Sequence, residues 1–570
     1  MILQALCDYY ERKSSDTEDP IAPPGFEWKP IPFVVEIDAN GRLVQVSDTR
    51  FQLQGKLRAK KFLVPQDIGR SSNVAANSLW DKASYALGVN QKVGATKLAK
   101  QKEVFVKEVK RIADKLPDDP ALKALLVFLN AQDMEAQLER STCYQELVEN
   151  DLPITFQFVG DKELICQRSK VLDVLRLSED DESDTTEGVC AVTGKVEEIA
   201  QKHSKTPIPG SKSNAKLVSF NDPAYISFGK KQSLNASIGK CAAFAYTTAL
   251  NHLLLRRIQV GDASTVFWSE KHTDLEDTFA DLFDEPPKDD PAKQTRAIEA
   301  LFKAPQTGAI SDEGGNTRFY VLGLAPNIAR ISVRFWQVGT VAEMSARIRQ
   351  HFEDLKISHA SFEKPYLSLF RLLKSIATQE DSKNIPPNLA GEFMRAILAG
   401  LPYPQTLLQA AVRRIRAERE VTYHRAALIK ACLNRQARYS PSQEKEIAVS
   451  LDDSNTNPGY RIGRLFSALE KIQEEASPGL NATIRDRFYG AASSSPVTVF
   501  ANLMKLKNHH LAKLEEGRKR YFEKLIGQIM SVINDFPAHL SLADQGRFAI
   551  GYYHQRQAFF TKSESTTKGE

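Results

Sequence analysis

The sequence has few cysteines, and no two of them are spaced for a metal or redox motif. Without a Cys-x-x-Cys pair, neither a disulfide framework nor a complete zinc ribbon has support, and a reducing cytoplasm is the expected location. The six cysteines among the 570 residues are Cys7, Cys143, Cys166, Cys190, Cys241 and Cys432.

Long apolar runs are also missing. A helix that spans a bilayer needs roughly 18 or more apolar residues in succession, and no charge-free stretch of that length occurs. The first residues, MILQALCDYYERK, turn charged at once and do not read as a secretory signal. The sequence therefore predicts no membrane span and no signal peptide.

Recognisable catalytic motifs are absent as well. The sequence contains no P-loop, no His-Glu-x-x-His, no Gly-x-Ser-x-Gly and no His-Asp dyad. This favours a protein that binds over one that catalyses, with no cofactor. The alternative from another class is a metal-dependent nuclease built from dispersed acids such as Asp81, Asp222 and Asp262.

The stretch VCAVTGK around Cys190 resembles half of a zinc ribbon. A structural zinc site needs four ligands, and Cys166 and His203 are the only near candidates. An ordinary buried thiol at Cys190 is therefore favoured, and no metal site is predicted. His509 and His510 are adjacent on a helical pattern, so they point about 100° apart and do not suit one metal ion.

Net charge is weak, which limits what composition says about partners. The chain has 76 basic and 71 acidic residues, a formal net charge of +5. Nucleic-acid binding therefore requires local basic patches. Hydrophobic residues make up 42% and charged residues 26%, as in globular proteins, and the length suggests roughly three or four domains.

Hydrophobic periodicity and turn residues predict an α+β fold, with mixed α/β regions followed by a C-terminal helical bundle. Four segments are expected: an N-terminal α/β domain at 1–210, a central mixed region at 211–340, a basic helical region at 341–445 and a bundle at 446–570. The expected helices are 1–13, 91–150 and about 237–255, and the Pro-rich stretch 16–32 is expected to be loop. The expected strands are 32–38 and 42–48 around Asn40-Gly41, then 154–160, 163–175, 264–268 and the run 318–336.

The polar stretch GRSSNVAANSLWDKASYALG, residues 69–88, allows two interpretations. In the first, Asn77 or Ser78 caps a helix that runs through Tyr85, and composition alone favours this cap. In the second, the stretch is a small finger whose polar groups read DNA. Its candidate contacts are Arg70, Ser71, Ser72, Asn73 and Asn77, preceded by Lys60 and Lys61.

Basic residues gather in three other places. Arg330 and Arg334 share a strand face with Ser332, opposite Ile331, Val333 and Phe335. Each of the two basic helical stretches is either a phosphate-binding surface or a solvated helix face. The first holds Arg413, Arg414, Arg416, Arg419, Arg425, Lys430, Arg435 and Arg438, and the second holds Lys505, Lys507, Lys513, Arg518, Lys519 and Arg520.

Several stretches, in order from residue 1 to about 560, resemble one family. They include MILQALCDYYER, SSNVAANSLWDKASYALG, CAAFAYTTALNHLL, VGDASTVFW, RFYVLGLAPNIARISVRFW and NPGYRIGRLFSALEKIQEEASPGLNATIRDRFYGAAS. The sequence resembles the large subunit of the type I-C CRISPR Cascade surveillance complex. The resemblance implies a subunit that is not an enzyme, recognises the protospacer-adjacent motif in duplex DNA, and helps to open the strands and form the R-loop.

The same resemblance implies the partners. These are the guide CRISPR RNA, double-stranded target DNA, the backbone and handle-binding Cascade subunits, a small subunit and a helicase-nuclease, with no membrane. It also implies that the C-terminal part, from near Val449, is made separately as the small subunit. A general RNA-binding scaffold without a DNA role stays open as an alternative.

The resemblance favours motif-reading residues on short loops. The candidates are Lys60, Lys61, Arg70, Ser71, Ser72, Asn73 and Asn77, with Gln232 and Asn235 in the loop QSLNAS. The candidates for contact with the nucleic-acid backbone are Arg330, Arg334, Arg413, Arg414, Arg416, Arg419, Lys505, Lys507 and Lys513.

Overall fold

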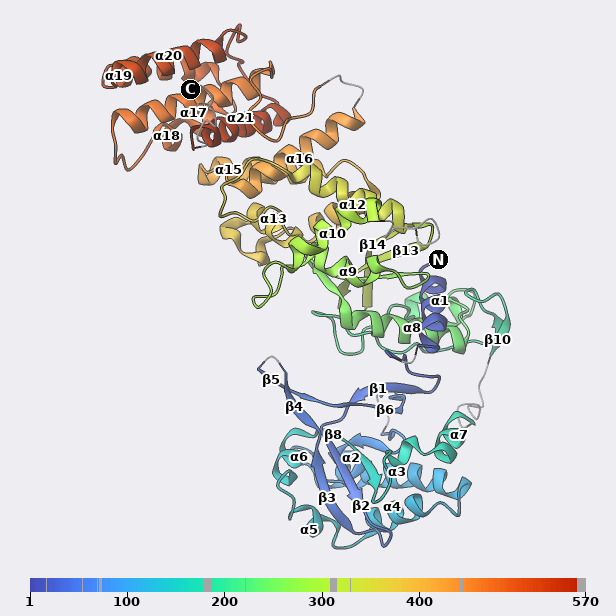
Figure 1. The fold of residues 1–570 in the computed structure, drawn as a ribbon. Coiled ribbons are helices and arrows are strands. Elements are labelled where there is room, and N and C mark those ends of the chain that lie inside the picture. Colours follow the sequence, from blue (N-terminus) through green and yellow to red (C-terminus); the bar gives the residue numbers. More distant parts are fainter. Residues whose placement is uncertain are drawn as a thin grey trace. The chain divides into compact units, whose positions relative to one another are not determined.

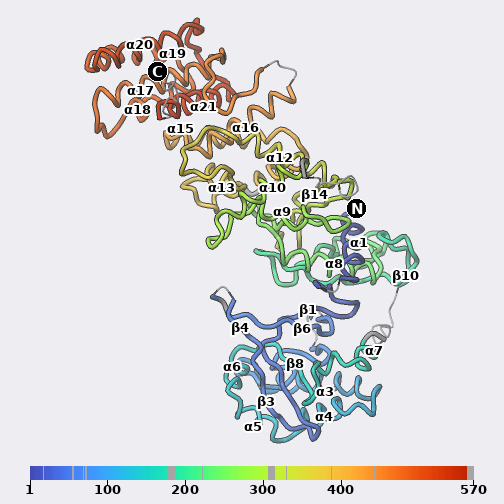
Figure 2. The backbone as a smooth tube through the Cα atoms, viewed as in Figure 1, coloured from blue at the N-terminus to red at the C-terminus, as the bar shows by residue number. Residues whose placement is uncertain are grey.

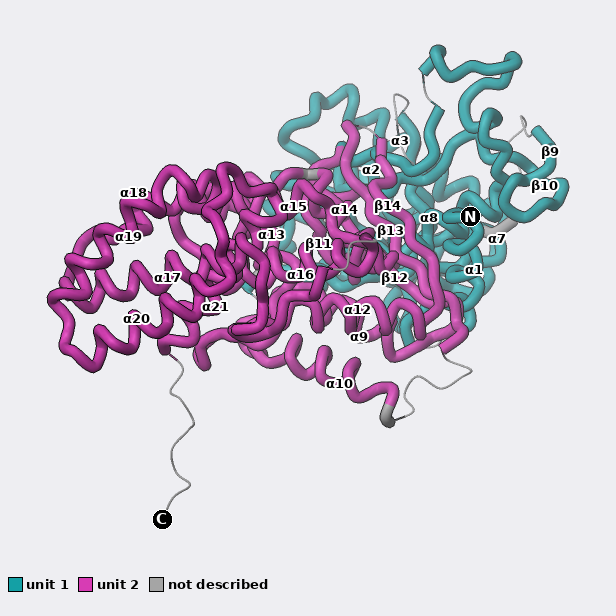
Figure 3. Tube along the Cα trace, turned by 90° about the horizontal axis from the view of Figure 1, so that it is seen from above, with its two compact units in different colours: residues 1–207, 212–252 teal, residues 208–211, 253–570 magenta. Residues whose placement is uncertain are grey.

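The computed structural model describes two compact units (Figure 3). Unit 1 comprises 1–207 and 212–252, and unit 2 comprises 208–211 and 253–570. The mixture of strands and helices with a helical C-terminal part confirms the predicted α+β class. The described residues are 1–16, 18–53, 55–68, 70, 74–177, 186–220, 222–307, 315–328, 330–440 and 444–560.

Unit 1 contains ten strands and several helices in its described part (Figure 1). The strands are β1 (Phe26–Pro30), β2 (Phe33–Ile37), β3 (Leu43–Asp48), β4 (Arg50–Leu53), β5 (Lys56–Ala59), β6 (Lys61–Pro65), β7 (Trp80–Lys82), β8 (Pro153–Phe158), β9 (Glu187–Val189) and β10 (Val196–Glu198). The α-helices are α1 (Ile2–Ser14), α2 (Ala83–Ala86), α3 (Ala95–Lys115), α4 (Pro120–Asn130), α5 (Met134–Leu138), α6 (Tyr144–Asn150), α7 (Ser169–Leu177) and α8 (Lys240–Leu253). Short 3-10 helices are η1 (Ile165–Gln167), η3 (Pro223–Tyr225) and η4 (Gln232–Asn235).

A four-stranded sheet in the order β3-β2-β8-β7 organises the first part of unit 1. The predicted hairpin is confirmed: β2 and β3 pair antiparallel around Gly41, whose φ of +71° suits glycine. β8 joins β2 in parallel, and α3 to α6 lie between these two strands in the chain. Phe33, Phe105 and Phe156 are fully buried in the core that results.

Two of the expected elements in unit 1 are wrong. The Pro-rich stretch contains β1, which pairs only with β6, and Pro30 stands at the strand end, where a missing N–H costs little. The expected strand 163–175 is η1 followed by α7. Val171 and Leu175, four residues apart, are buried on one helical face.

The remaining part of unit 1 joins segments that are far apart in the sequence. α1 lies beside α8 (Figures 1 and 2): the Tyr9 hydroxyl is 3.0 Å from His252 Nδ1, and Cys7 Sγ donates to the Ala242 carbonyl. The predicted helices at 1–13 and near 237–255 are therefore confirmed, and they pack on each other.

Unit 2 is a four-stranded antiparallel sheet followed by helices. Its strands are β11 (Ile258–Val260), β12 (Ala263–Ser269), β13 (Arg318–Asn327) and β14 (Arg330–Thr340), after the 3-10 helix η5 (Leu254–Arg256). Its α-helices are α9 (Asp274–Phe283), α10 (Lys293–Thr307), α12 (Val341–Leu355), α13 (Leu369–Ile376), α14 (Pro387–Ala399), α15 (Gln405–Glu418), α16 (Tyr423–Tyr439), α17 (Pro458–Ala476), α18 (Ile484–Ala492), α19 (Val497–Leu511), α20 (Glu516–Met530) and α21 (Leu542–Phe560). Two further 3-10 helices are η6 (Thr378–Glu380) and η7 (Ser382–Asn384).

One hydrophobic core runs from the sheet of unit 2 into the last helix. It begins with residues such as Phe279 and Phe335 and continues to Tyr552 and Tyr553. The apolar face of α17, with Leu465, Leu469 and Ile472, and that of α20, with Phe522, Ile526 and Ile529, are buried in it. The four-segment division of the sequence stays a prediction, although this core is shared across residue 446.

The strand alternation predicted around Arg334 breaks at a β-bulge. Gly323 pairs with Phe335 and Leu324 pairs with Val333, so Arg334 is the extra residue. Ile331 and Phe335 are buried as expected, but Val333 is 44% exposed. The bulge changes which side chains face solvent, a change that period-two reasoning does not detect.

Candidate nucleic-acid interface

The loop between β6 and β7 is anchored on a buried carboxylate. Asp81, 1% exposed, accepts the Arg70 guanidinium and the backbone N–H groups of Asn77 and Lys82, both at 2.8 Å. Burial raises the pKa of Asp81, and the Arg70 charge opposes that rise. The Arg70 guanidinium also lies 3.8 Å from the centre of the Tyr85 ring. Arg70 therefore holds the end of the loop in place.

Asn77 is part of the same anchor and does not cap a helix. Asn77 is only 2% exposed, and its side-chain Oδ1 accepts the Ile68 N–H at 3.2 Å. The predicted cap is wrong, because Trp80–Lys82 forms β7 and the short helix α2 begins only at Ala83. Leu79, with φ of +61°, makes the turn that separates loop from strand. Base contact by Asn77 stays a prediction.

The other end of the loop is also held by hydrogen bonds and an ion pair. Gln66 Nε2 donates to Ser204 Oγ at 2.9 Å, and Asp67 pairs with Lys205 at 2.7 Å. The Trp80 indole N–H donates to the Pro65 carbonyl at 2.7 Å. The candidates Ser71, Ser72 and Asn73 lie outside the described residues.

Lys60 and Lys61 stand just before this loop. Both are exposed, and Lys61 opens β6, which leads directly into Gln66. The Lys60 ammonium lies 5.2 Å from the centre of the Phe62 ring. These two cations are placed where a phosphate backbone can reach them.

The second candidate loop, around Gln232 and Asn235, uses its asparagine internally. The Asn235 amide donates to the carbonyls of Lys230 and Gln232 at 2.8 and 2.9 Å. Gln232 is exposed and has a φ of +49°. Asn235 therefore fixes the shape of the loop, while Gln232 is open to solvent.

The structure brings the two predicted loops to one connecting segment, 201–205. Ser204 and Lys205 contact the first loop, as described above, and the Gln201 carbonyl accepts the Ser233 N–H of the second loop at 3.3 Å. Sequence reasoning did not foresee this meeting, because nothing in the spacing links residue 66 to residue 233. We call the two loops and this segment the loop cluster.

Four lysines that the sequence analysis missed lie in the loop cluster or, in the case of Lys216, near its connecting segment. Burial lowers the pKa of Lys216, and the neighbouring charge of Lys202 lowers it further, so two like charges lie close together. Lys230 and Lys231 are exposed. Within the described residues, none of these four lysines has an ion-pair partner. The adjacent lysines in SFGKKQS, residues 227–233, are the sequence feature that could have revealed Lys230 and Lys231.

The basic stretch 411–440 divides into an outer and an inner half. On α15, Arg413 and Arg416 are exposed and make no ion pair with any described residue, whereas Arg414 pairs with Glu418 at 3.0 Å. Arg419 ends the helix in the left-handed region, with φ of +59°.

The inner half is α16, where Arg425, Lys430 and Arg435 are buried and Arg438 is exposed. Arg435 Nε donates to Asp354 at 2.6 Å, and Arg438 pairs with the same carboxylate. Lys430 Nζ donates to the Asp354 carbonyl at 3.0 Å, and Arg425 is 1% exposed. Asp354 therefore holds Lys430, Arg435 and Arg438, and Arg425 pairs with Glu418, so these cations already have partners within the chain.

The remaining predicted cations lie on unit 2. Lys505 on α19 and Lys513 beyond its end are exposed, and Lys507 is half-buried. Arg334 pairs with Asp262 at 2.6 Å, and Arg330 opens β14. Other basic side chains of the last stretch have acidic partners: Arg518 pairs with Glu475 and Arg520 with Glu516.

The acids of the alternative nuclease hypothesis have separate roles. Asp81 holds Arg70, the Asp222 carboxylate accepts the Ala224 N–H at 2.9 Å, and Asp262 pairs with Arg334. The Cys190 sulfur accepts backbone N–H groups from two residues. Among the described residues, no group of three His, Cys, Asp or Glu side chains is arranged to hold a metal ion.

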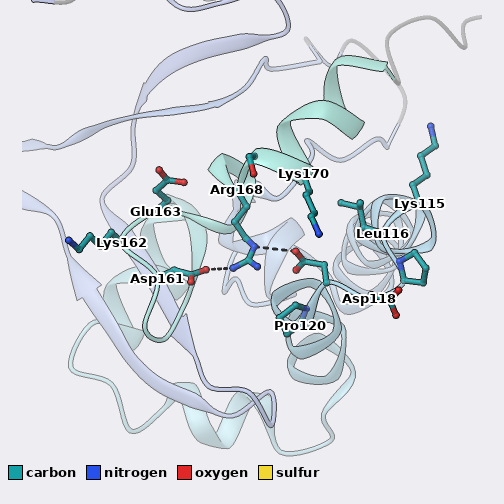
Figure 4. A pocket seen from close by; sticks show the side chains of 12 residues that line it. Lys115, Leu116, Asp118, Pro120, Asp161, Lys162, Glu163, Arg168 and Lys170 are labelled. Atoms are coloured by element: carbon teal, nitrogen blue, oxygen red, sulfur yellow. Dashed lines mark hydrogen bonds and ion pairs between the residues drawn. The ribbon is translucent and has the colours of Figure 1, made fainter.

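A polar cavity of about 540 Å³ lies beside the start of α4 (Figure 4). Arg168 bridges Asp119, at 3.2 Å, and Asp161 within it. The lining has balanced charge: Lys115, Lys162, Arg168 and Lys170 face Asp118, Asp119, Asp161 and Glu163. Because the lining carries as many acidic as basic side chains, it does not favour an anionic ligand.

Exposed basic side chains that have no ion-pair partner among the described residues occur separately in the loop cluster of unit 1 and on α15 of unit 2. No described helix is long and apolar enough to cross a membrane, and no curated protein matches the sequence. The family model for the CRISPR-associated protein (Cas_Csd1) matches residues 6–560. The chain therefore belongs to the CRISPR-associated protein family Cas_Csd1.

Proposed function

We propose that the chain is the large subunit of a type I-C RNA-guided DNA surveillance complex. In this proposal it recognises the protospacer-adjacent motif in duplex DNA, helps to open the strands and helps to recruit the helicase-nuclease. It acts in the cytoplasm by binding, without a catalytic step of its own. The observation that carries the proposal is family membership across residues 6–560.

The loop cluster supports a DNA-reading role for unit 1. Its second loop is fixed internally by the Asn235 amide, and a fixed loop places polar groups against base edges at little cost in conformational entropy. The lysines around them provide charge for the phosphates, which position a protein on DNA without specifying sequence. The specific readout is then left to exposed polar side chains such as Gln232.

A division of labour follows from general RNA-guided recognition. The protein reads only a short motif and the helical shape, and pairing with the guide RNA reads the sequence. Binding energy from the motif contacts helps to nucleate unwinding, at about 1–3 kcal/mol for each good bidentate contact to a base. The exposed arginines of α15 contribute sequence-independent contacts to the nucleic-acid backbone.

The test uses the assembled guide-RNA complex and a library of duplex targets that differ only in the bases beside the matched sequence. The proposal expects the complex to retain a restricted set of adjacent sequences. Equal retention of all sequences would support an RNA-binding scaffold and contradict the proposal. Metal-dependent cleavage by the purified chain, lost on Asp81→Ala, Asp222→Ala or Asp262→Ala, would also overturn it.

Substitutions in the first loop test its role within this function. Asn73→Ala and Asn77→Ala are each expected to weaken binding to the selected target while the complex still assembles. Because the Asn77 side chain is internal, its substitution acts by loosening the loop. Unchanged target affinity in both variants would make the loop purely structural.

A further inference from the structure

The hairpin formed by β4 and β5 in unit 1 has two free edges. The two strands pair antiparallel, with Phe51 opposite Arg58 and Gln52 opposite Leu57. In the part of the chain that the structure describes, neither strand pairs with a third one. Figure 1 shows the two strands extending beyond the β3-β2-β8-β7 sheet. We call β4 and β5 together the β4–β5 arm.

The large apolar side chains of the β4–β5 arm are exposed. Phe51 is 48% exposed, Leu53 45% and Leu57 54%. Because side chains alternate along a strand and cross-strand partners share a face, Phe51 and Leu53 lie on one face and Leu57 lies on the other. A two-stranded hairpin is marginally stable in water at best, and apolar side chains left in solvent add nothing to it. This pattern points to a surface that another molecule covers.

The base of the arm is fixed to the body of unit 1. The Thr49 N–H donates to the Pro32 carbonyl at 2.9 Å. Arg50 pairs with Asp48 at 2.7 Å and also with Glu146. The arm therefore leaves unit 1 in a defined direction, so that less entropy is lost when it binds.

Charge indicates the kind of partner. From Thr49 to Lys61 the chain has five basic residues and no acidic one. Arg58 is exposed and has no ion-pair partner among the described residues. A basic arm with apolar side chains fits a site that has an apolar floor and an acidic rim, because protein interfaces place complementary charge around an apolar centre.

The arrangement of the apolar side chains favours a groove in a protein. Phe51 and Leu53 face away from Leu57, so a flat surface such as a bilayer would cover only one face of the arm. A base stack admits a single side chain as a wedge, whereas these three side chains lie along both strands, and the turn carries Gly55 with φ of +73°. A groove covers both faces of the arm at once.

The β9–β10 hairpin provides a comparison within unit 1. Val189 and Val196 are also exposed, at 59% and 71%, but they are directly opposite each other and share one face. The strands of this hairpin carry Glu187, Glu197 and Glu198 and no basic residue. Exposed apolar side chains alone are therefore not the signal. Apolar side chains on two faces, together with purely basic charge, distinguish the β4–β5 arm from this hairpin.

We propose that the β4–β5 arm docks in a groove of a neighbouring protein subunit. Phe51, Leu53 and Leu57 contact the apolar floor and walls of this groove, and Arg58 pairs with acidic side chains at its rim. This inference rests on the proposed function, because it takes the neighbour from the guide-RNA complex. It gives unit 1 a protein contact in addition to its contact with DNA.

The experiment measures how the chain joins the other subunits. These subunits, assembled with guide RNA, are immobilised, and the affinity of each chain variant is measured by surface plasmon resonance at several salt concentrations. Phe51→Ser with Leu57→Ser is expected to weaken association by about 30-fold or more, as truncation of buried interface anchors does. Arg58→Glu is expected to weaken association most at low salt, where the attraction between charges is least screened.

Matched measurements separate the arm from general effects. The free Phe51→Ser, Leu57→Ser variant should keep the circular dichroism and the unfolding midpoint of the wild type, because both side chains are about half exposed before binding. Val196→Ser, on the β9–β10 hairpin, should leave the affinity unchanged. An equal loss of affinity in Val196→Ser would overturn the inference.

A photo-crosslinking residue identifies the occupant. Benzoylphenylalanine in place of Phe51 is expected to join the chain to a peptide of another protein subunit in the assembled complex, as mass spectrometry of the digested product reads out. A crosslink to the guide RNA, to target DNA or to this chain itself would overturn the inference.

The outcomes distinguish this inference from the function on which it rests. If the complex retains a restricted set of adjacent sequences and either the Phe51→Ser, Leu57→Ser variant or Arg58→Glu associates as the wild type does, the docking arm is wrong and the proposed function stands. If the wild-type chain does not join the guide-RNA complex, the proposed function itself fails.

Discussion

Three buried histidines share one arrangement at the residue scale. The Nδ1 atoms of His203, His351 and His554 lie 2.7, 2.6 and 2.9 Å from the hydroxyls of Tyr246, Tyr403 and Tyr460, respectively. Burial, followed by a nearby cation, lowers the pKa of His203 and His554 to about 4 and that of His351 to about 3. Their Nε2 atoms have no hydrogen-bond partner, so these sites hold neutral imidazoles.

This arrangement predicts that the folded chain loses stability as the pH falls. Unfolded imidazoles take up protons near pH 6.5, but the folded sites do so only near pH 3 to 4. As pH falls below 6.5 the unfolded state gains protons first, so the free energy of unfolding drops, by up to about 1.4 kcal/mol per pH unit for each histidine. His351→Gln should reduce the slope of the unfolding free energy against pH by up to about 1.4 kcal/mol per pH unit, which corresponds to one proton, between pH 6 and 4.5. Urea unfolding at each pH measures this slope. The exposed His272→Gln is the control, and parallel curves for wild type and His351→Gln would contradict the prediction.

The Arg70–Asp81 pair allows a second prediction at this scale. Arg70→Met leaves the Asp81 carboxylate buried without its cation, so unit 1 should lose about 3 kcal/mol or more of unfolding free energy at pH 7.5. The loss should shrink toward pH 5, because a buried carboxyl with a raised pKa takes up a proton instead. Denaturant unfolding of unit 1 at both pH values measures this. Arg111→Met, which breaks a more exposed pair with Glu108, is the control, and equal losses in both variants would contradict the prediction.

At the scale of elements, glycines allow α17 and α21 to touch. A Cβ on Gly551 would lie 2.0 Å from the Tyr460 backbone oxygen, and one on Gly463 would lie 2.1 Å from the Phe548 backbone oxygen. Neither neighbour is a flexible side chain, so the helices must separate to admit a methyl group. Gly551→Ala should therefore cost several kcal/mol, about as much as a severe core substitution.

A second helical glycine gives the matched control. Gly527 on α20 has open space around its missing side chain, so Gly527→Ala should stabilise the chain by about 0.5–1 kcal/mol through helix propensity alone. Thermal or urea unfolding of both variants measures the contrast. Similar effects of the two substitutions would mean that α17 and α21 are not in close backbone contact.

The exposed face of α15 gives a prediction on nucleic-acid binding. Arg413→Ala with Arg416→Ala should reduce the slope of log affinity against log salt by up to about 2 for the assembled complex, because each phosphate contact contributes about 0.7–0.9. Arg414→Ala should leave the slope unchanged, because Glu418 already pairs with that guanidinium. An unaltered slope in the double variant would make α15 an ordinary solvated helix.

The sequence predicted the helices and strands better than it predicted the contacts of the candidate interface. Periodicity located the long helices and the Asn-Gly hairpin, because local pattern and burial agree there. It failed at 163–175, where a short apolar run fits either strand or helix, and at Arg334, where a bulge shifts the pattern. For the site, composition indicated the two loops. Which charges turn inward is decided by ion pairs with Asp81 and Asp354, and periodicity does not reveal these pairs; Asp354 lies 81 residues from Arg435.

At the scale of the whole molecule, the C-terminal helices pack on one another and also on earlier helices of unit 2. Phe466, Tyr489, Phe548 and Tyr552 form an aromatic cluster between α17, α18 and α21. On its other side α21 packs on earlier helices: a Cβ on Gly546 would lie 3.1 Å from an Ile429 side-chain atom. A fragment from residue 446 therefore keeps the first set of contacts and loses the second.

This predicts how such a fragment behaves. Residues 446–570 expressed alone should be helical and fold cooperatively, because the close α17–α21 contact is internal to the fragment. The fragment should unfold at lower urea concentration than the same segment in the full chain, since the hydrogen bond from the Tyr553 hydroxyl to the Ser358 carbonyl and the apolar contact with Ile429 are lost. Circular dichroism and hydrogen exchange on α21 in both proteins measure the difference.

The substitution Gly546→Ser, made in both proteins, is the control. It should lower the stability of the full chain, where side-chain atoms of Ile429 and Leu433 lie close to that position, and should not lower the stability of the fragment. A fragment without helical structure would show that the aromatic cluster cannot sustain the bundle alone.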